Sequence, residues 1–95
     1  MTRDEILNAI KASGPRLVAL GVRELALFGS HARGDAGPDS DVDFIVEFSE
    51  KSFDRYMELR EVLEELLGRK VDLVLKGAIK PRLRERILSE AVRAA

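Results

Sequence analysis

An apolar run that stops at a glycine–serine pair, and a second apolar run that opens on two acids, constrain this sequence more than any other feature. Residues 25–28 form the first run and are followed by Gly29 and Ser30, while Asp41 and Asp43 stand at the start of the second. Side chains two positions apart in a strand point to the same face, so the two carboxylates should converge. Close carboxylates repel each other, and proteins tolerate them mainly where a cation or a shared proton compensates. Together with a glycine turn that exposes backbone N–H groups at a helix start, the pattern predicts an anion-plus-metal site.

The rest of the chain predicts several helices and three strands. Helical periodicity, capping residues and breaks at glycine or proline predict helices over residues 3–12, 15–20, 30–33, 53–67 and 81–94, and strands over residues 24–28, 41–48 and 70–75. Two helices should turn apolar stripes inward: Phe53, Met57, Leu63, Leu66 and Leu67 in one, and Leu83, Ile87, Leu88 and Ala91 in the last. We therefore expect a small α/β (α+β) domain, with a mixed sheet of three or four strands and helices largely on one face.

Length and composition limit the class of protein. Ninety-five residues suffice for one domain with a modest core, which we place over residues 1–95, and not for two. The charged fraction is 35% but the net charge is only −1, whereas a dedicated nucleic-acid binder normally has a clear basic excess. The chain has no cysteine, no signal-peptide core at its N-terminus, and no apolar run near the ~20 residues of a membrane span. A soluble cytoplasmic protein that does not bind nucleic acid directly is expected.

The glycine turn and the acids resemble a known signature. Gly29-Ser30, Gly34 and the run Ser40-Asp41-Val42-Asp43 resemble the Gly-Ser…Asp-x-Asp signature of the DNA polymerase β-like nucleotidyltransferase superfamily. They are most similar to its smallest branch, the minimal nucleotidyltransferases, and to the antitoxin halves of HEPN/MNT toxin–antitoxin pairs. Residues 69–74 resemble the strand that carries the third carboxylate in this family, and residues 84–91 its closing helix. The resemblance therefore covers nearly the whole chain and implies the polymerase β-like nucleotidyltransferase fold.

The resemblance also implies roles for single residues in a magnesium-dependent transfer from a nucleoside triphosphate. The metal-binding and catalytic residues would be Asp41, Asp43 and Asp72, which would hold two Mg²⁺ ions, and the nucleotide-binding residues Gly29, Ser30, Arg33 and Ser40. The third acid would also help to deprotonate the acceptor hydroxyl. The glycine–serine turn would meet the β and γ phosphates, although the serine could equally cap the following helix. The arginine either answers triphosphate charge or is a solvated helix-end residue, and the second serine either touches phosphate or buttresses its strand.

In the family that the chain resembles, the partner is a HEPN toxin, a small helical ribonuclease. The resemblance implies that AMP is transferred from ATP to a tyrosine of this toxin, which neutralises it within a hetero-oligomer. Two other functions stay open: a non-catalytic antitoxin that binds and occludes its toxin, and a nucleotidyltransferase that acts on a small molecule. The second needs an acceptor-binding domain for which 95 residues leave no room.

Two further features have simple interpretations. The only histidine, His31, should face solvent from its short helix. Basic residues gather late in the sequence, at Arg69, Lys70, Lys76, Lys80, Arg82, Arg84 and Arg86. They form either a solvated helix face or an edge that docks an acidic partner or RNA. The aromatic residues do not interleave with them, so recognition of nucleic acid by base stacking is not expected.

Overall fold

The computed structural model describes residues 1–50 and 52–95 as a four-stranded sheet with flanking helices. The elements in chain order are α1 (Arg3–Ala12), α2 (Gly14–Ala19), β1 (Val22–Phe28), α3 (Gly29–Arg33), β2 (Val42–Phe48), α4 (Phe53–Leu67), β3 (Val71–Leu75), the 3₁₀ turn η1 (Lys76–Ala78), α5 (Pro81–Glu90) and β4 (Val92–Arg93). The predicted helices and strands are all present, most within one or two residues of the expected bounds.

The sheet is mixed, as predicted, and its strand order is β3-β2-β1-β4. Strand β1 runs antiparallel to both β2 and β4, whereas β2 and β3 are parallel. Phe28 pairs with Asp43, and Asp43 pairs in turn with Asp72, so these three residues form one row across the sheet. Paired residues on neighbouring strands point to the same face. The register thus brings together two acids that lie 29 positions apart in the sequence.

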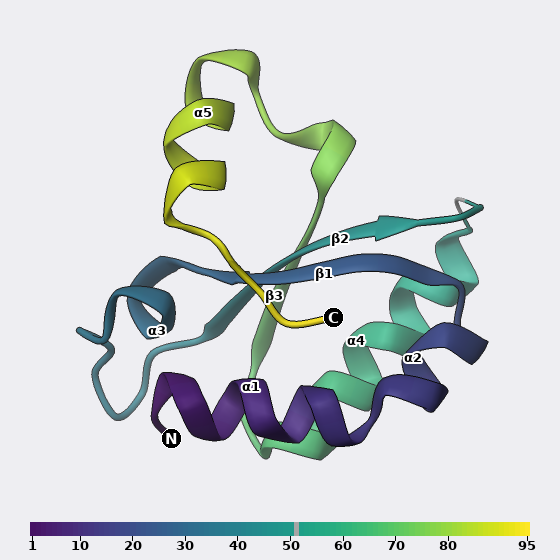
Figure 1. The fold of residues 1–95 in the computed structure, drawn as a ribbon, viewed down its shortest axis with the longest axis horizontal. Coiled ribbons are helices and arrows are strands. Elements are labelled where there is room, and N and C mark those ends of the chain that lie inside the picture. The colour runs from purple at the N-terminus through teal and green to yellow at the C-terminus, as the bar shows by residue number, and fades with distance from the viewer. Residues whose placement is uncertain (51) are drawn as a thin grey trace.

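Helices cover the two faces of the sheet unequally (Figure 1). Helices α1, α2 and α4 lie against one face, and α5 stands over the other. The core lies under the first group, where Ile6 and Ile10 of α1 and Leu59 and Leu63 of α4 are fully buried with Phe44 of β2. The prediction of helices largely on one face is confirmed. The less covered face, which carries the row of acids, is called the open face below.

The termini of two helices follow from their sequences. Thr2 and Glu5 form the predicted capping box of α1: the Glu5 N–H donates to Thr2 Oγ1 at 3.2 Å, and the Thr2 N–H donates to Glu5 Oε1 at 2.9 Å. Helix α4 ends at Gly68, which adopts the left-handed conformation at φ 64°. The capping box thus defines the start of α1, and the glycine defines the end of α4, in the layer of helices that covers one face of the sheet (Figure 1).

The C-terminal segment differs from the prediction of a helix over residues 81–94. Helix α5 ends at Glu90, and Val92 and Arg93 form the short edge strand β4 beside β1. Backbone pairing with the otherwise free edge of β1 outweighs helix propensity here: the Ala94 N–H donates to the Leu25 carbonyl at 2.7 Å. Helix α5 contains no buried residue along its fully described length.

The predicted burial of two apolar stripes, on α4 and α5, is confirmed only in part. Leu63 and Leu67 of α4 are buried as predicted, but Phe53 at its first position is 77% exposed. In α5, Leu83 remains 39% exposed. Within the described residues, no helix is long and apolar enough to span a bilayer.

Candidate active site at the carboxylate row

The row of acids lies where the strands β2 and β3 begin. Asp43 is half-buried and Asp72 is exposed, and their register places both side chains on the open face. Val42 and Phe44, on either side of Asp43, are fully buried on the opposite face, as the alternation predicted. Asp41 is exposed and stands just before β2. The structure therefore brings the second and third predicted acids into register and keeps the first beside them.

The electrostatics of the row are those of a carboxylate cluster. Burial raises the pKa of Asp43, and the charges of Asp72 and Asp41 raise that pKa further. Arg33 is near enough to oppose these effects, although it acts more weakly than either of the two acids. The ionised form of Asp43 is thus disfavoured in the protein alone, and a bound cation would relieve this cost.

Gly29 lies directly against Asp43, and two independent reasons require a glycine there. Its φ of +74° lies in the left-handed region, which side chains with a Cβ rarely adopt. A Cβ at this position would also overlap Asp43 Oδ2 and lie 3.1 Å from Asp43 Cγ. The turn and the carboxylate predicted from distant parts of the sequence therefore touch each other.

Ser30 is the second residue of α3. The N-cap of this helix is Phe28, and no side chain in the described part of the chain hydrogen-bonds to cap it. The alternative in which the Ser30 hydroxyl acts as the N-cap is therefore wrong. The helix begins at Gly29, which lies against Asp43, so the free N–H groups of its first turn are at the end of the helix nearest the carboxylates, where an anion could be bound.

Arg33 closes α3 and takes part in a small ion-pair group. Its Nε lies 3.2 Å from Asp35 Oδ2, and its Nη1 lies 3.3 Å from Glu90 Oε2 of α5. The two acids raise the pKa of its guanidinium, with Asp35 the larger cause. The side chain is half exposed at the end of α3, and its charge also reaches Asp43, so a contact with triphosphate stays a prediction.

Ser40 participates in the loop that precedes β2. Its Oγ accepts a hydrogen bond from the Gly37 N–H at 3.0 Å, which closes the turn before Asp41. The contact favours the buttressing alternative over direct contact with phosphate. The loop is further held by Arg69, whose Nη1 donates to the Pro38 carbonyl at 3.0 Å.

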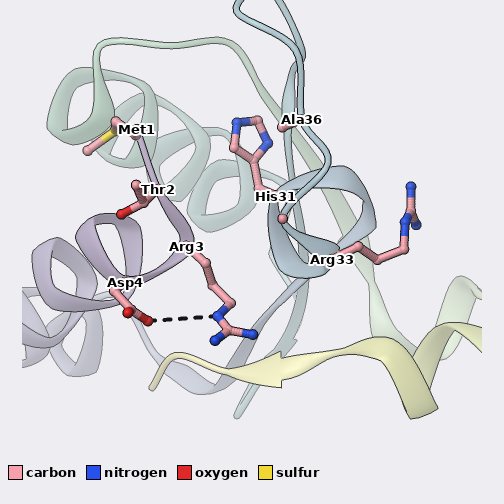
Figure 2. Close-up of a pocket in the computed structure, with 8 residues that line it drawn as sticks. Met1, Thr2, Arg3, Asp4, His31, Arg33 and Ala36 are labelled. Atoms are coloured by element: carbon pink, nitrogen blue, oxygen red, sulfur yellow. Dashed lines mark ion pairs between the residues drawn. The ribbon is translucent and has the colours of Figure 1, made fainter.

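His31 was expected to face solvent, and this prediction is wrong. The side chain is only 3% exposed and extends between the start of α1 and the loop after α3, near Met1 and Ala36 (Figure 2). Burial lowers the pKa of His31 and the charge of Arg69 lowers it further, while a hydrogen bond with the Asp41 backbone acts in the opposite direction. The neutral ring therefore packs behind the segment that presents Asp41.

No signal in the sequence distinguishes His31 from a surface residue. A five-residue helix has too few positions to reveal which of its faces is apolar, and the start of α1, which lines the same pocket as His31, is far from it in the sequence. Figure 2 shows that His31 and Arg33 leave α3 in different directions. His31 lies near the backbone of Asp41, whereas Arg33 reaches toward α5.

The donor set fits a magnesium ion that is shared with a ligand. Among residues 1–50 and 52–95, no three acidic or histidine side chains converge closely enough to hold a metal ion by themselves. Mg²⁺ is usually bound by one or two carboxylates together with substrate phosphates, and rarely by an all-protein cage. The pair Asp43 and Asp72, with the phosphate-binding type of turn at Gly29 beside it, matches that arrangement.

Comparison with known proteins agrees with this geometry. A family model described as a nucleotidyltransferase domain matches residues 3–94. A protein of Thermococcus cleftensis named protein adenylyltransferase MntA is 44% identical over 94 residues, which cover 97% of this chain and 95% of that protein. A Methanocaldococcus jannaschii protein described as a protein adenylyltransferase is 44% identical over 79 residues, which cover 82% of this chain and 85% of that protein.

Solved structures share the fold. A structure described as a minimal nucleotidyltransferase is 36% identical, with a TM-score of 0.84 over 97% of this chain and 95% of that chain. A toxin–antitoxin structure with AMP-PNP has a TM-score of 0.69 at 21% identity, over 100% of this chain and 73% of that chain. An MNT antitoxin in complex with a tri-AMPylated HEPN toxin of Shewanella oneidensis has a TM-score of 0.59 at 18% identity, over 90% of this chain and 71% of that chain.

Proposed function

The chain belongs to the nucleotidyltransferase domain family, and from this premise we propose that it is a protein adenylyltransferase that acts as an antitoxin. As a single domain over residues 1–95 in the cytoplasm, it transfers AMP from ATP to a tyrosine of a HEPN-type toxin and so neutralises it. The observation that carries the proposal is the register of Asp43 and Asp72 beside the Gly29 turn, in a chain 44% identical to a named protein adenylyltransferase.

Each part of the row has a role in this reaction. Asp43 and Asp72, with Asp41 beside them, would hold Mg²⁺ together with the phosphates of the nucleotide, and the ion would offset the negative charge of the triphosphate and of the leaving pyrophosphate. The tyrosine oxygen forms a bond to the α-phosphorus as the bond from that phosphorus to the bridging oxygen of pyrophosphate breaks. Asp72 is the more exposed acid of the register pair and accepts the proton of the tyrosine hydroxyl.

The phosphate groups are held on the side of the row that α3 occupies. Gly29 lets the backbone approach the ligand closely, and the Ser30 hydroxyl and the N–H groups of the first turn donate to the β and γ phosphates. Arg33 adds positive charge at the same end. The structural relatives with AMP-PNP and with an AMPylated HEPN toxin support the choice of nucleotide and of partner.

The test follows label from ATP marked on either the α- or the γ-phosphate, with Mg²⁺ and the partner toxin as acceptor. We expect covalent label on a toxin tyrosine from the α-marked nucleotide only. Asp43→Asn should reduce this transfer by about 100- to 1,000-fold or more, because it removes a carboxylate ligand of the Mg²⁺ that would offset charge on the reacting phosphate. Asp39→Asn, which neutralises an exposed acid of the loop before β2, serves as the matched control and should retain activity.

Two results would contradict the proposal. Neutralisation of the toxin without any covalent label would assign the chain to the occluding antitoxins. Transfer by Asp43→Asn at the rate of Asp39→Asn would remove the carboxylate row from the mechanism.

A further inference from the structure

An apolar pocket of about 300 Å³ lies between α5 and the open face of the sheet. Its floor consists of Phe28, Ile45 and Val74, one from each of the three long strands. Leu83 and Ile87 of α5 form its roof. The apolar residues of α5 are incompletely buried, so the roof of the pocket consists of side chains that the fold leaves partly exposed, whereas Ile45 in the floor is buried.

The pocket adjoins the carboxylate row on the same face. Ile45 pairs with Val74 in the register, directly after the pair Asp43 and Asp72, and a step of two residues along a strand is about 7 Å. Phe28 contributes to both features, because it pairs with Asp43 and immediately precedes Gly29. The open face therefore presents a turn suited to phosphate, a row of acids and an apolar pocket as neighbours along the same strands.

We propose that this pocket receives the base of the nucleotide substrate. The inference rests on the proposed function and names the part of the substrate that the carboxylate row does not hold. A nucleotide is a single ligand with a charged polyphosphate at one end and a flat ring at the other, which matches this sequence of surfaces. The volume is at the lower end of the range for ligand pockets, roughly 300–1,000 Å³, and suits one ring system.

A protein side chain is the less suitable occupant. The pocket is covered by α5, whose C-terminal end is joined to α3 by the Arg33–Glu90 ion pair at 3.3 Å. A tyrosine from a partner would have to bring its main chain beneath this helix. The base of a nucleotide enters from the row of acids and needs no such space.

The lining also determines how selective the pocket is. Of the described residues that line it, Lys80 is the only one with a polar side chain. Strong discrimination between related ligands depends on polar groups that are left unpaired by the wrong ligand. Because the pocket offers no pattern of donors and acceptors to the edge of a base, it binds the ring by apolar contact and distinguishes the four bases weakly.

The test compares two ligands that differ by the nucleoside. Binding to the full chain is measured by calorimetry with Mg²⁺ and either α,β-methylene-ATP, which resists transfer, or inorganic tripolyphosphate. Leu83→Ala removes part of the roof at a position that is already 39% exposed, so the fold should tolerate it. Leu88→Ala, on the same helix but outside the pocket lining, is the matched control.

We expect Leu83→Ala to weaken binding of α,β-methylene-ATP by roughly 3- to 10-fold and to leave tripolyphosphate unchanged, because only the ring loses apolar contact. Leu88→Ala should change neither. The corresponding analogues of GTP, CTP and UTP should bind the wild type within about 10-fold of the ATP analogue, since no polar contact separates them.

The opposing outcomes separate the two proposals. Unchanged binding of the ATP analogue by Leu83→Ala, with its loss in Asp43→Asn, would overturn the pocket assignment and keep the nucleotidyltransferase site. An unchanged nucleotide affinity with a raised KM for the protein acceptor would assign the pocket to the acceptor side chain instead. Failure of the wild type to bind either ligand would overturn the proposed function and the pocket together. A preference of more than about 100-fold for one base would overturn the weak discrimination.

Discussion

The two faces of the sheet are formed by the same strands but differ in what they contact. On the face under α1 and α4, β2 presents Val42, Phe44 and Val46, all fully buried. On the open face it presents Asp43, half-buried in a row of acids, and then Ile45 beside the pocket under α5. Because side chains alternate along the strand, β2 contributes core residues to one face and candidate functional residues to the other. Substitutions on the two faces should therefore affect different measurements.

Phe44→Ala should have the largest effect on stability. The side chain is fully buried in the core, and truncation of a buried phenylalanine costs about 3–5 kcal/mol. A small domain has a total stability of about 5–15 kcal/mol, so the variant should be close to unfolding. Urea denaturation followed by circular dichroism measures the loss. Phe53→Ala is the matched control, because that ring is 77% exposed and its loss should cost little. A similar cost for both would show that the core is not where the structure places it.

Gly29→Ala should reduce both the stability of the fold and the transfer activity. Its left-handed φ of +74° alone should cost about 1–2 kcal/mol, and the new Cβ would also displace the Asp43 carboxylate, so transfer should fall sharply. Gly34→Ala separates the two causes. It shares a left-handed φ of +83°, but its Cβ would meet no atom of the described chain within 4 Å. Denaturation and the transfer assay are measured on both variants. Equal activity in the two would show that the contact between Gly29 and Asp43 does not matter for transfer.

Asp43→Asn should stabilise the protein in the absence of ligands, in contrast to the changes above. Burial and the neighbouring charges of Asp72 and Asp41 disfavour the ionised carboxylate, and an amide of the same shape avoids that cost. With Mg²⁺ and α,β-methylene-ATP the wild type should be the more stable of the two proteins. A ligand that binds only the folded state raises stability by mass action, and the variant should bind this ligand more weakly. Thermal unfolding with and without ligand shows this crossover. A ligand-free variant that is less stable than the wild type would indicate that Asp43 is a structural residue.

The open face was predicted well from the sequence because its pattern is local. Asp41 and Asp43 stand two residues apart, and Gly29 adjoins a strand end, so strand alternation and turn chemistry suffice. Asp72 was placed beside them only through a resemblance, since spacing within one strand carries no information about its partner. The register Asp43–Asp72 then confirmed the placement.

The parts that were missed depend on contacts between distant segments. The edge strand β4 forms because β1 offers a free edge, which no feature of residues 91–95 announces. His31 is buried because α1 lies beside α3. The pocket under α5 is lined by residues of three strands and of a helix far from two of them in the sequence. Each is a consequence of tertiary pairing that outweighs local propensity.

Glu5→Gln should have the smallest effect, and it should be confined to stability in acid. Hydrogen bonds with Thr2, chiefly to its backbone, lower the pKa of Glu5 below its usual value. The ionised form is therefore favoured by folding. Its contribution is present above the pKa of the unfolded chain and is lost as the pH falls through the lower pKa of the folded state. We expect the wild type to be slightly more stable than the variant at neutral pH and to approach it in that acid range.

Urea midpoints measured across the acid range test this, with Glu58→Gln on the exposed side of α4 as a control for the loss of one surface charge. The capping box belongs to the helical layer and not to the open face, so AMP transfer at neutral pH should be unchanged in Glu5→Gln. A loss of transfer in this variant would show that the start of α1 influences the carboxylate row, through His31 and the backbone of Asp41 that it contacts. The separation of the two faces would then be incomplete at that end of the sheet.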